Sequence, residues 1–258
     1  MLEASNLAAL SGVRHGFFTR RGGGSDDEMG DMNGLNCGFG SDDLPENVAR
    51  NREIALQRMG VPAGQLVTAY QVHSAKAISV EQPWARAQSP EVDAMASNQS
   101  GVVLGILTAD CTPVLFADAE AGVVGAAHAG WRGARSGVLE ACLNEMISLG
   151  AEPGRTVAAI GPCIAQQSYE VGPEFQADFM DEDSANARFF EPSERDGHFM
   201  FDLPGYVLER LQSQGLASIE ALGIDTCSDA ERFYSYRRCT LNGEKDYGRL
   251  LSAICLEE

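Results

Sequence analysis

The side chains best suited to metal chemistry lie at three separate points of the chain. His73 stands in AYQVHS, Cys111 in LTADCTP and His128 in AAHAGWRG, each near the end of an expected strand. Imidazole and thiolate are good zinc ligands, and three protein ligands with one open position describe the usual catalytic zinc site. The small residues around His128 leave room beside its ring for a metal and a substrate. If the three strand ends converge, these residues form a zinc centre.

The same residue types also fit other arrangements. Cys111 and His128 on neighbouring strand ends suit a cysteine hydrolase, in which the thiol attacks and the imidazole acts as base. A non-catalytic metal-binding module would use the same three side chains without catalysing a reaction. Alternatively, His128 is a buried, hydrogen-bonded histidine and Cys111 a small core residue, and neither binds a metal. Blue and trinuclear copper centres need about ten imidazoles. The chain has only 4 histidines, so we expect zinc rather than copper.

Composition limits the partners and the compartment. The net charge of −18 disfavours binding to nucleic acid or to an acidic membrane surface. The longest apolar runs, such as GVVLGIL, are far shorter than a membrane span, and no export signal opens the chain. The 7 cysteines form no CxxC pair, which predicts reduced thiols. We therefore expect a cytoplasmic protein with small-molecule partners, either a monomer or a homodimer.

The hydrophobic pattern predicts a chain rich in sheet at its centre. Short β-branched runs predict strands at residues 13–19, 66–74, 76–82, 102–107, 113–118, 122–128, 156–161, 197–202 and 249–257. Apolar residues at helical spacing predict helices at residues 45–60, 136–150, 172–180 and 203–215. Strands often follow one another without a helix between them, which favours the α+β class with mixed sheets and outer helices. No linker divides residues 1–258, so we expect a single domain.

Six motifs in order and spacing resemble those of one family. They are HGFFTRRGGGS, QVHS, TADCTPVLFAD, AAHAGWRG, IGPCI with YEVG, and FYSYRR. Together they resemble the YfiH family, long labelled polyphenol oxidase or laccase and related to mammalian laccase-domain-containing protein 1. The resemblance runs from about residue 13 to residue 250.

The resemblance implies both a fold and an activity. The implied fold is a layered α/β/β/α sandwich, and the implied cofactor is a zinc ion bound by His73, Cys111 and His128. The implied activity is phosphorolysis of purine nucleosides, namely adenosine, inosine and methylthioadenosine, together with deamination of adenosine. A zinc-bound hydroxide serves deamination. The HxE and PCxxC signature of the cytidine deaminases is missing from this sequence, so deamination here requires a different framework.

Phosphorolysis needs an anion site and a proton donor for the departing base. The RRGGGS segment offers backbone amides with Arg20 and Arg21, and Gly23 and Ser25 belong to the same expected phosphate loop. Asp110, next to the expected metal ligand, is the candidate acid. Its alternative role is that of a loop carboxylate that caps backbone amides.

Further substrate contacts are expected from two aromatic and basic segments. Trp131 and the aromatic residues of RFYSYRR have rings that can stack on a purine, although core packing is the more common role of such rings. Arg132 and Arg237 are candidates for orienting the substrate. The sequence departs from the family after SYRR, where CTLNGEKDYGRLL is longer than the TGR segment of relatives. If this loop borders the site, we expect an altered substrate preference.

Overall fold

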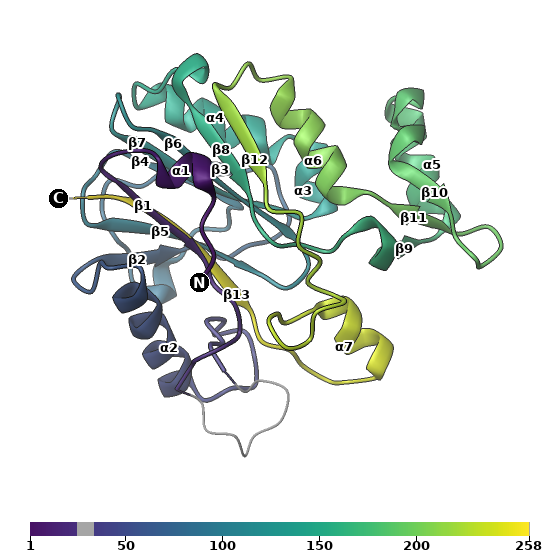
Figure 1. Ribbon diagram of the computed structural model, residues 1–258, viewed down its shortest axis with the longest axis horizontal. Helices are drawn as coiled ribbons and strands as arrows, with labels where there is room; N and C mark the ends of the chain where they lie inside the picture. Colours follow the sequence, from purple (N-terminus) through teal and green to yellow (C-terminus); the bar gives the residue numbers. More distant parts are fainter. Residues whose placement is uncertain (25–33, 258) are drawn as a thin grey trace.

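Two mixed β-sheets packed face to face form the centre of the structure, a computed structural model that describes residues 1–24 and 34–257 (Figure 1). The larger sheet has six strands in the order β12-β8-β6-β7-β4-β3, and the smaller has four in the order β1-β13-β5-β2. Their bounds are β1 Val13–Phe17, β2 Gln65–Thr68, β3 Ala77–Ser79, β4 Ala94–Ser97, β5 Val102–Thr108, β6 Thr112–Asp118, β7 Val123–Ala129, β8 Val157–Ile160, β12 Ser218–Ala221 and β13 Leu250–Leu256.

Both sheets combine parallel and antiparallel neighbours. The pairs β12–β8, β3–β4 and β2–β5 are parallel, whereas the remaining pairs in these two sheets are antiparallel. This arrangement confirms the expected α+β class with mixed sheets. Because β2 and β5 run parallel, their carboxyl ends meet at the same edge of the smaller sheet, where the candidate ligands follow.

The central strands are apolar because both of their faces are covered. Every residue of β6 and β7 is buried. Along β6, Val114 and Phe116 pack on the helix side, whereas Leu115 and Ala117 pack in the core between the sheets. Strands buried on both faces read as continuous hydrophobic runs rather than as an alternation of polar and apolar residues. This burial explains the short β-branched runs of the sequence.

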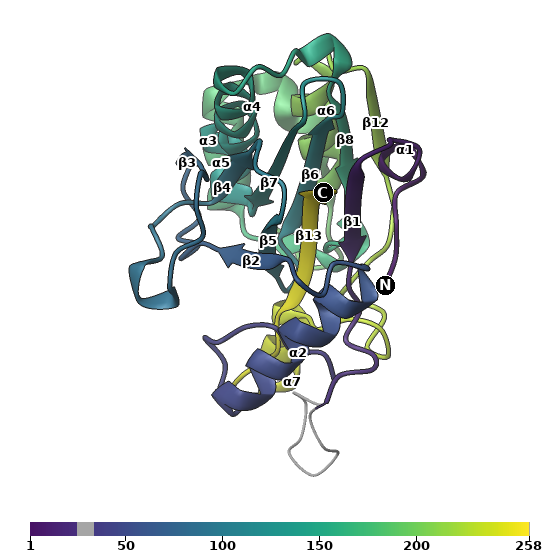
Figure 2. The ribbon, with the colours of Figure 1, turned by 90° about the vertical axis from the view of Figure 1, so that its left-hand side faces the viewer.

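Helices cover the outer faces of both sheets and complete the expected α/β/β/α layers. The larger sheet packs against α3 (Trp131–Ser136), α4 (Val138–Ser148) and α6 (Leu203–Gln212), and the smaller sheet packs against α2 (Pro45–Arg58). Figure 2 shows α2 and α4 on opposite sides of the stacked sheets. The expected helix at 136–150 is in fact α4 alone, because Gly137, with φ of +95°, separates it from α3.

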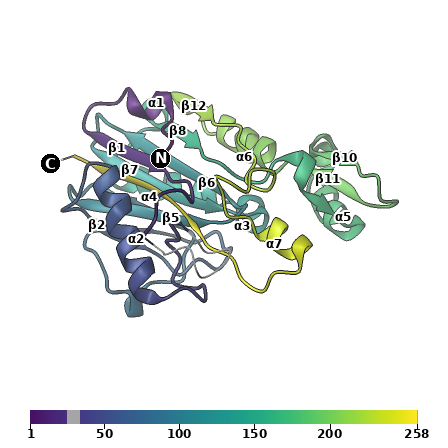
Figure 3. The same cartoon turned by 60° about the horizontal axis from the view of Figure 1, so that its bottom comes forward.

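A small third sheet projects from one end of the sandwich (Figures 1 and 3). Its antiparallel strands are β9 (Glu170–Val171), β11 (Phe199–Phe201) and β10 (Phe190–Pro192), and it packs with α5 (Pro173–Glu182). Phe179 lies at its centre, with ring centroids of Phe201 at 4.9 Å and Phe175 at 5.1 Å. This aromatic cluster belongs to the same core as the helices of the larger sheet.

The remaining elements are short. They are α1 (Ser5–Ala8), α7 (Tyr236–Asn242) and the 3₁₀ helices η2 (Arg86–Gln88), η3 (Pro153–Arg155), η4 (Gln166–Ser168) and η5 (Ser184–Phe189). The expected strand at 66–74 ends at Thr68, because the backbone amides of residues 72–74 bond to a carboxylate instead of a neighbouring strand. Within the described residues, no helix has the length and apolar character needed to cross a lipid bilayer.

Substitution of one side chain tests how much the core between the sheets contributes to the free energy of unfolding. Leu104 on β5 is fully buried there. We expect Leu104→Ala to lower the free energy of unfolding by about 2–5 kcal/mol, because the variant loses apolar burial and leaves a cavity. Chemical denaturation measures the change. Leu241→Ala, at a side chain 74% exposed, is the matched control with an expected change below about 0.5 kcal/mol; equal losses in both would contradict this account of the core.

Candidate metal centre and its cavity

The structure brings His73, Cys111 and His128 together although they come from distant parts of the chain. One ligand atom from each lies within 4.8 Å of the others, and Cys111 Sγ is 3.7 Å from His73 Nε2. His73 lies in the loop after β2, Cys111 precedes β6, and His128 is near the end of β7. The expected convergence of strand ends therefore occurs at the edge where the two sheets meet.

Asp93, a fully buried carboxylate, positions two of these three residues. Its Oδ1 accepts hydrogen bonds from His128 Nδ1 at 2.8 Å and from the backbone N of His73 at 2.9 Å. Its Oδ2 accepts from the backbone N of Ser74 at 2.6 Å and from Ser74 Oγ at 2.8 Å. Because Nδ1 of His128 is engaged, Nε2 is the nitrogen left to act as a ligand. A carboxylate that holds the second nitrogen of a ligating imidazole is a common feature of metal sites.

The backbone of the His73 loop adopts an uncommon conformation that these hydrogen bonds maintain. His73 has φ of +60°, in the left-handed region that non-glycine residues rarely occupy. The amides of Val72, His73 and Ser74 all donate to Asp93. Three hydrogen bonds to one carboxylate offset the cost of this conformation, which is of order 1–3 kcal/mol. The loop therefore holds the His73 ring beside the other two donors.

The protonation equilibria of the cluster favour a thiolate. Burial raises the pKa of the Cys111 thiol, but the charge and hydrogen bond of His128, followed by those of His73, outweigh burial and lower that pKa to about 6. Burial also raises the pKa of Asp93, yet the hydrogen bonds from His128 and Ser74 bring it to about 2. The thiolate is the form of cysteine that binds metal. Asp93 remains ionised and keeps the His128 ring oriented.

The donor set and the space around it fit a zinc ion. Two imidazoles and one thiolate are borderline to soft ligands that suit zinc, and ligand atoms in a tetrahedral zinc site lie about 3.3–3.6 Å apart. The ligand atoms here lie within 4.8 Å of one another, so the widest separation exceeds this range by about 1.2 Å. Gly130 leaves the neighbouring space open, since a Cβ there would stand 2.8 Å from His73 Cδ2 and 3.0 Å from Cys111 Sγ. The residues present would hold the ion through His73, Cys111 and His128.

A cavity of about 600 Å³ opens beside the three donors. All three donors line it, together with residues of α2, of the loops after β2 and β5, of α7 and of the segment that follows α7. Its aromatic side chains are Phe39, Tyr70, Tyr236 and Tyr247, and its arginines are Arg52, Arg86 and Arg249. Such a cavity is large enough for a nucleoside-sized ligand and provides both aromatic faces and positive charge.

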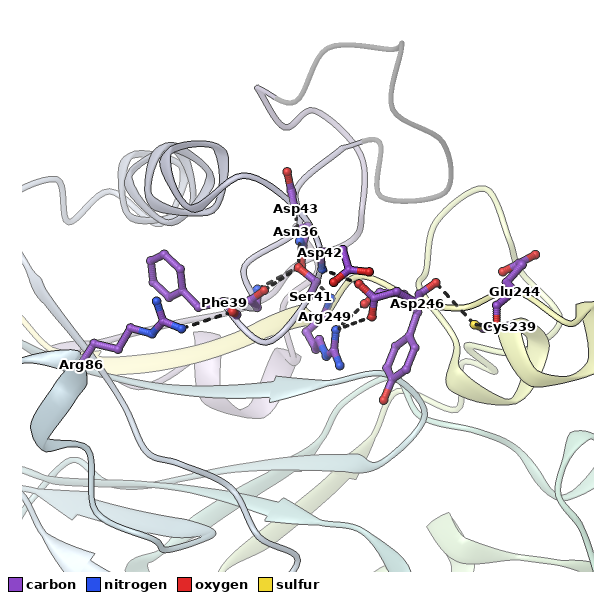
Figure 4. A network of polar contacts seen from close by, with 12 residues as sticks. Asn36, Phe39, Ser41, Asp42, Asp43, Arg86, Cys239, Glu244, Asp246 and Arg249 are labelled. Atoms are coloured by element: carbon purple, nitrogen blue, oxygen red, sulfur yellow. Dashed lines mark hydrogen bonds and ion pairs between the residues drawn. The ribbon is translucent and has the colours of Figure 1, made fainter.

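Two loops that border this cavity are joined by a polar network (Figure 4). Asn36 is fully buried, and its Oδ1 accepts from the backbone N of Arg249 at 2.9 Å. The backbone N of Asp42 donates to Asp246 Oδ2 at 2.6 Å, and Arg249 pairs with Asp246 Oδ1 at 3.3 Å. These contacts connect the loop that carries Phe39 to the 239–249 loop. The segment that departs from the family pattern therefore does border the candidate site.

The carboxylate of Asp110 is surrounded by hydrogen-bond donors from a distant part of the chain. Its carboxylate accepts hydrogen bonds from Thr226 Oγ1 at 2.7 Å, Ser235 Oγ at 2.8 Å and the backbone N of Arg237 at 2.7 Å. Burial raises its pKa against these hydrogen bonds. Asp110 is not among the described residues that line the cavity. The contacts give it the capping role named as its alternative, and its role as a catalytic acid stays a prediction.

The described residues of the expected phosphate loop also lie outside the cavity lining. Arg20 lines a separate cavity of about 140 Å³, with its guanidinium 4.5 Å from the ring centroid of Tyr234. Arg21 is exposed and pairs with Glu231 at 2.6 Å. Gly23 packs against the backbone of residue 34. Ser25 lies outside the described residues. The structure therefore does not bring Arg20, Arg21 or Gly23 together with the metal donors.

The remaining predicted substrate contacts are Trp131, Arg132 and Arg237. Trp131 packs on Phe175, with ring centroids 4.7 Å apart, and therefore contributes to the core. Arg132 is exposed, and its guanidinium lies over the Trp131 ring at 5.0 Å. Arg237 donates to the backbone O of Glu170 at 2.9 Å. None of the three belongs to the described lining of the cavity, whereas Tyr236 of the SYRR motif does.

Sequence reasoning missed Asp93 and the arginines of the cavity. Asp93 directly precedes a buried strand, in EVDAMAS, and that position is the available signal for a buried carboxylate. Arg52 lies within the helix expected at residues 45–60, yet it lines the cavity, as does Arg86. No motif marks Arg86 in the sequence.

The site and fold together define a class of layered α/β proteins with a histidine–cysteine–histidine centre. The model of the family described as multi-copper polyphenol oxidoreductase laccase matches residues 14–257, so the chain belongs to this family. A similar solved structure is a Neisseria meningitidis protein of the DUF152 family, with a TM-score of 0.82, 33% identity and 96% of each chain covered. Bacillus licheniformis YfiH has a TM-score of 0.83 at 26% identity, covering 95% of this chain and 93% of its own. The expected YfiH resemblance and layered fold are confirmed.

Two similar proteins are named as purine nucleoside phosphorylases. A Deinococcus radiodurans protein named purine nucleoside phosphorylase is 39% identical over 92% of this chain and 87% of its own length. A Streptomyces griseus protein named purine nucleoside phosphorylase ORF3 is 37% identical over the full length of both chains.

Asp93 provides the first test of the centre. We expect Asp93→Asn to weaken zinc binding about 10- to 100-fold, because it removes the charge that orients His128 and the His73 loop. Competition with a chromogenic chelator measures the affinity. Asp118→Asn is the control, since Asp118 is also fully buried but caps Glu152 and pairs with Arg155. Equal zinc affinity in Asp93→Asn and the parent protein would refute the positioning role.

Gly130 tests the space beside the donors. We expect Gly130→Ala to weaken zinc binding, because its Cβ would press on the His73 ring and the Cys111 sulfur at 2.8 Å and 3.0 Å. Gly154→Ala, where a Cβ meets nothing within 4 Å, is the control for the substitution itself. Metal content after dialysis against a weak chelator gives the readout, and retention of zinc by Gly130→Ala would show that the donors do not need this open space.

Proposed function

We propose that this protein is a zinc-dependent purine nucleoside phosphorylase. The observation that carries the proposal is the His73, Cys111 and His128 cluster opening on a cavity with exposed aromatic rings and arginines. The names of relatives 39% and 37% identical over most or all of the chain support it. Nucleoside and phosphate are then the partners, and the cavity offers each of them a chemically suitable surface.

The aromatic rings of the cavity suit the purine. Tyr70 is 64% exposed and Tyr236 is 55% exposed, so both present ring faces to the cavity without first leaving a packed core. Tyr247 lies 5.2 Å from Tyr236 between ring centroids and extends the same aromatic wall. Stacking on aromatic side chains contributes about 1–3 kcal/mol for a base and tolerates different bases. This tolerance is consistent with a site that accepts adenosine, inosine and methylthioadenosine.

The reaction exchanges one bond at the anomeric carbon for another. An oxygen of hydrogen phosphate forms a bond to C1′ while the bond from C1′ to the purine nitrogen breaks, and its electron pair goes to that nitrogen. The proton of hydrogen phosphate ends on the purine, so the products are free base and ribose 1-phosphate. The chain's residues hold the two reactants in contact, which lowers the entropic part of the barrier. A bound zinc ion supplies Lewis-acid polarisation of a substrate oxygen or nitrogen.

The finer assignments belong to the same proposal. We propose adenosine deamination as a second activity of the cavity, in which water replaces the C6 amino group and ammonia leaves. Zinc is preferred to copper because the donor set holds only two imidazoles. We further propose that residues 1–258 act as one domain, as a monomer or a homodimer, in the cytoplasm.

Incubation with adenosine tests the activity directly. We expect adenine and ribose 1-phosphate to form with phosphate present, and neither product to form in phosphate-free buffer. Cys111→Ala and His73→Ala should lower kcat/KM at least about 100-fold, because each removes one of three protein ligands. Cys227→Ala and His198→Ala remove a thiol and an imidazole outside the cluster and are the matched controls. Chromatography with a coupled phosphate assay follows the products, and their absence in the parent protein would overturn the proposal.

The cysteine hydrolase, with Cys111 as nucleophile and His128 as base, remains the second candidate, because one ligand atom of each residue lies within 4.8 Å of the other. Metal analysis separates the two candidates. Stoichiometric zinc that disappears in both Cys111→Ala and His73→Ala supports the phosphorylase. Alkylation of Cys111 by an acyl-substrate analogue in metal-free, active protein supports the hydrolase. Metal binding without turnover of nucleosides, phenols or acyl compounds would instead indicate a non-catalytic module.

A further inference from the structure

Two arginines on the wall of the cavity lie over the same aromatic ring. The Cζ atoms of Arg52, from α2, and Arg86, from η2, are each 4.4 Å from the ring centroid of Phe39. Both side chains line the cavity that also contains His73 and Cys111. Two positive charges thus gather beside the candidate metal centre of a chain whose net charge is −18.

These two charges are not neutralised by the described part of the chain. Arg249, the third arginine of the cavity, pairs with Asp246 at 3.3 Å. In residues 1–24 and 34–257, by contrast, no carboxylate lies within ion-pair distance of Arg52 or Arg86. Burial, together with the charge of Arg86, lowers the pKa of Arg52 to about 10. An anion placed between the two guanidinium groups would offset this repulsion.

The guanidinium groups also retain unused donors. Arg52 Nε donates to the backbone O of Cys37 at 2.8 Å, and its Nη1 donates to Thr68 Oγ1 at 3.3 Å. Arg86 Nη2 donates to the backbone O of Phe39 at 3.3 Å (Figure 4). Each guanidinium carries five N–H groups, so several remain for an oxyanion after these contacts. The contacts to Cys37 and Thr68 hold Arg52 in place in advance, which reduces the entropy lost when an anion binds.

The Gly-rich segment has its own internal partners. Arg21 pairs with Glu231, and Arg58 of α2 donates to the backbone O atoms of Arg21 at 3.0 Å and Gly22 at 2.6 Å. The backbone N of Gly24 donates to Asn51 Oδ1 at 2.9 Å. These contacts use part of the segment to fasten it to α2. The positive charge that adjoins the metal donors comes from another part of the chain.

From this contrast we propose that the phosphate co-substrate binds to the guanidinium groups of Arg52 and Arg86, beside Phe39, rather than at the Gly-rich segment. The proposal rests on the proposed function for the choice of phosphate as the anion. Guanidinium groups bind oxyanions through paired, charge-assisted hydrogen bonds, which direct the anion as well as attract it. A phosphate held there shares one cavity with the aromatic rings assigned to the purine and with the three metal donors.

Direct binding of inorganic phosphate tests the site without requiring turnover. Isothermal titration calorimetry on zinc-loaded protein, with the zinc content of every variant measured and matched, gives the Kd for phosphate. We expect Arg86→Ala to raise this Kd about tenfold, because it removes a charge and several donors. Arg52→Lys keeps the charge but loses the planar fork, so we expect a rise of several-fold. Circular dichroism verifies that each variant is folded.

Two further variants decide where the anion binds. Arg195→Ala removes the same charge at a side chain that is 69% exposed in the loop between β10 and β11. This variant should leave the Kd within about twofold, since an exposed charge is screened. Arg21→Ala tests the Gly-rich segment.

If Arg21→Ala raises the Kd for phosphate and Arg86→Ala does not, the proposed location of the phosphate is wrong. Equal rises in Arg86→Ala and Arg195→Ala, or no phosphate binding by the parent protein, also overturn it. Phosphate binding lost in Arg86→Ala, without ribose 1-phosphate formation by the parent protein, supports the site and refutes the phosphorylase.

Discussion

The candidate centre depends on one buried carboxylate. Asp93 joins the loop after β2, in one sheet, to the His128 ring on β7, in the other, through hydrogen bonds of 2.6–3.2 Å. Without those bonds the left-handed backbone at His73 has no local support, and the His128 ring has no preferred nitrogen. An ionised group with no exposed surface is costly unless every oxygen is well bonded. Asp93 satisfies this condition because the bonds that keep it ionised also hold the two imidazoles in place.

The sequence predicted the main strands and helices, and the structure brings its three candidate donors together. Apolar runs such as those of β6 and β7 predict buried strands directly, because both faces of each strand are covered. His73, Cys111 and His128 were recognisable from residue type and from their place near strand ends. Their actual separation depends on sheet order and on Asp93, which periodicity does not reveal. The expected strand at residues 66–74 was too long because the backbone amides of residues 72–74 donate to the carboxylate of Asp93 instead of to a neighbouring strand. Asp93 is remote from these residues in the sequence.

Charge was the feature that local sequence described least well. The Arg20-Arg21 doublet adjoins glycines and therefore suggests an anion site, yet Arg21 forms an ion pair with Glu231. Arg86 stands in a segment without a motif, and its position over the Phe39 ring is visible only in the folded chain. Whether an arginine is available to bind an anion depends on which carboxylates surround it in the folded chain. The order of residues along the sequence does not reveal those neighbours. Contacts between distant loops, including Asn36 with Arg249, decide the shape of the cavity in the same way.

The three donors come from both β-sheets of the sandwich and from the connection between them. His73 follows a strand of the smaller sheet, His128 belongs to the larger one, and Cys111 stands in the connection that crosses from β5 to β6. An ion held by all three would cross-link the two sheets at their common edge. Folding and ion uptake then become linked equilibria, since a species that binds only the native state stabilises it by mass action. Heat tolerance in this chain would consequently rise and fall with metal supply, and metal starvation would expose the molecule to unfolding and turnover as well as inactivity.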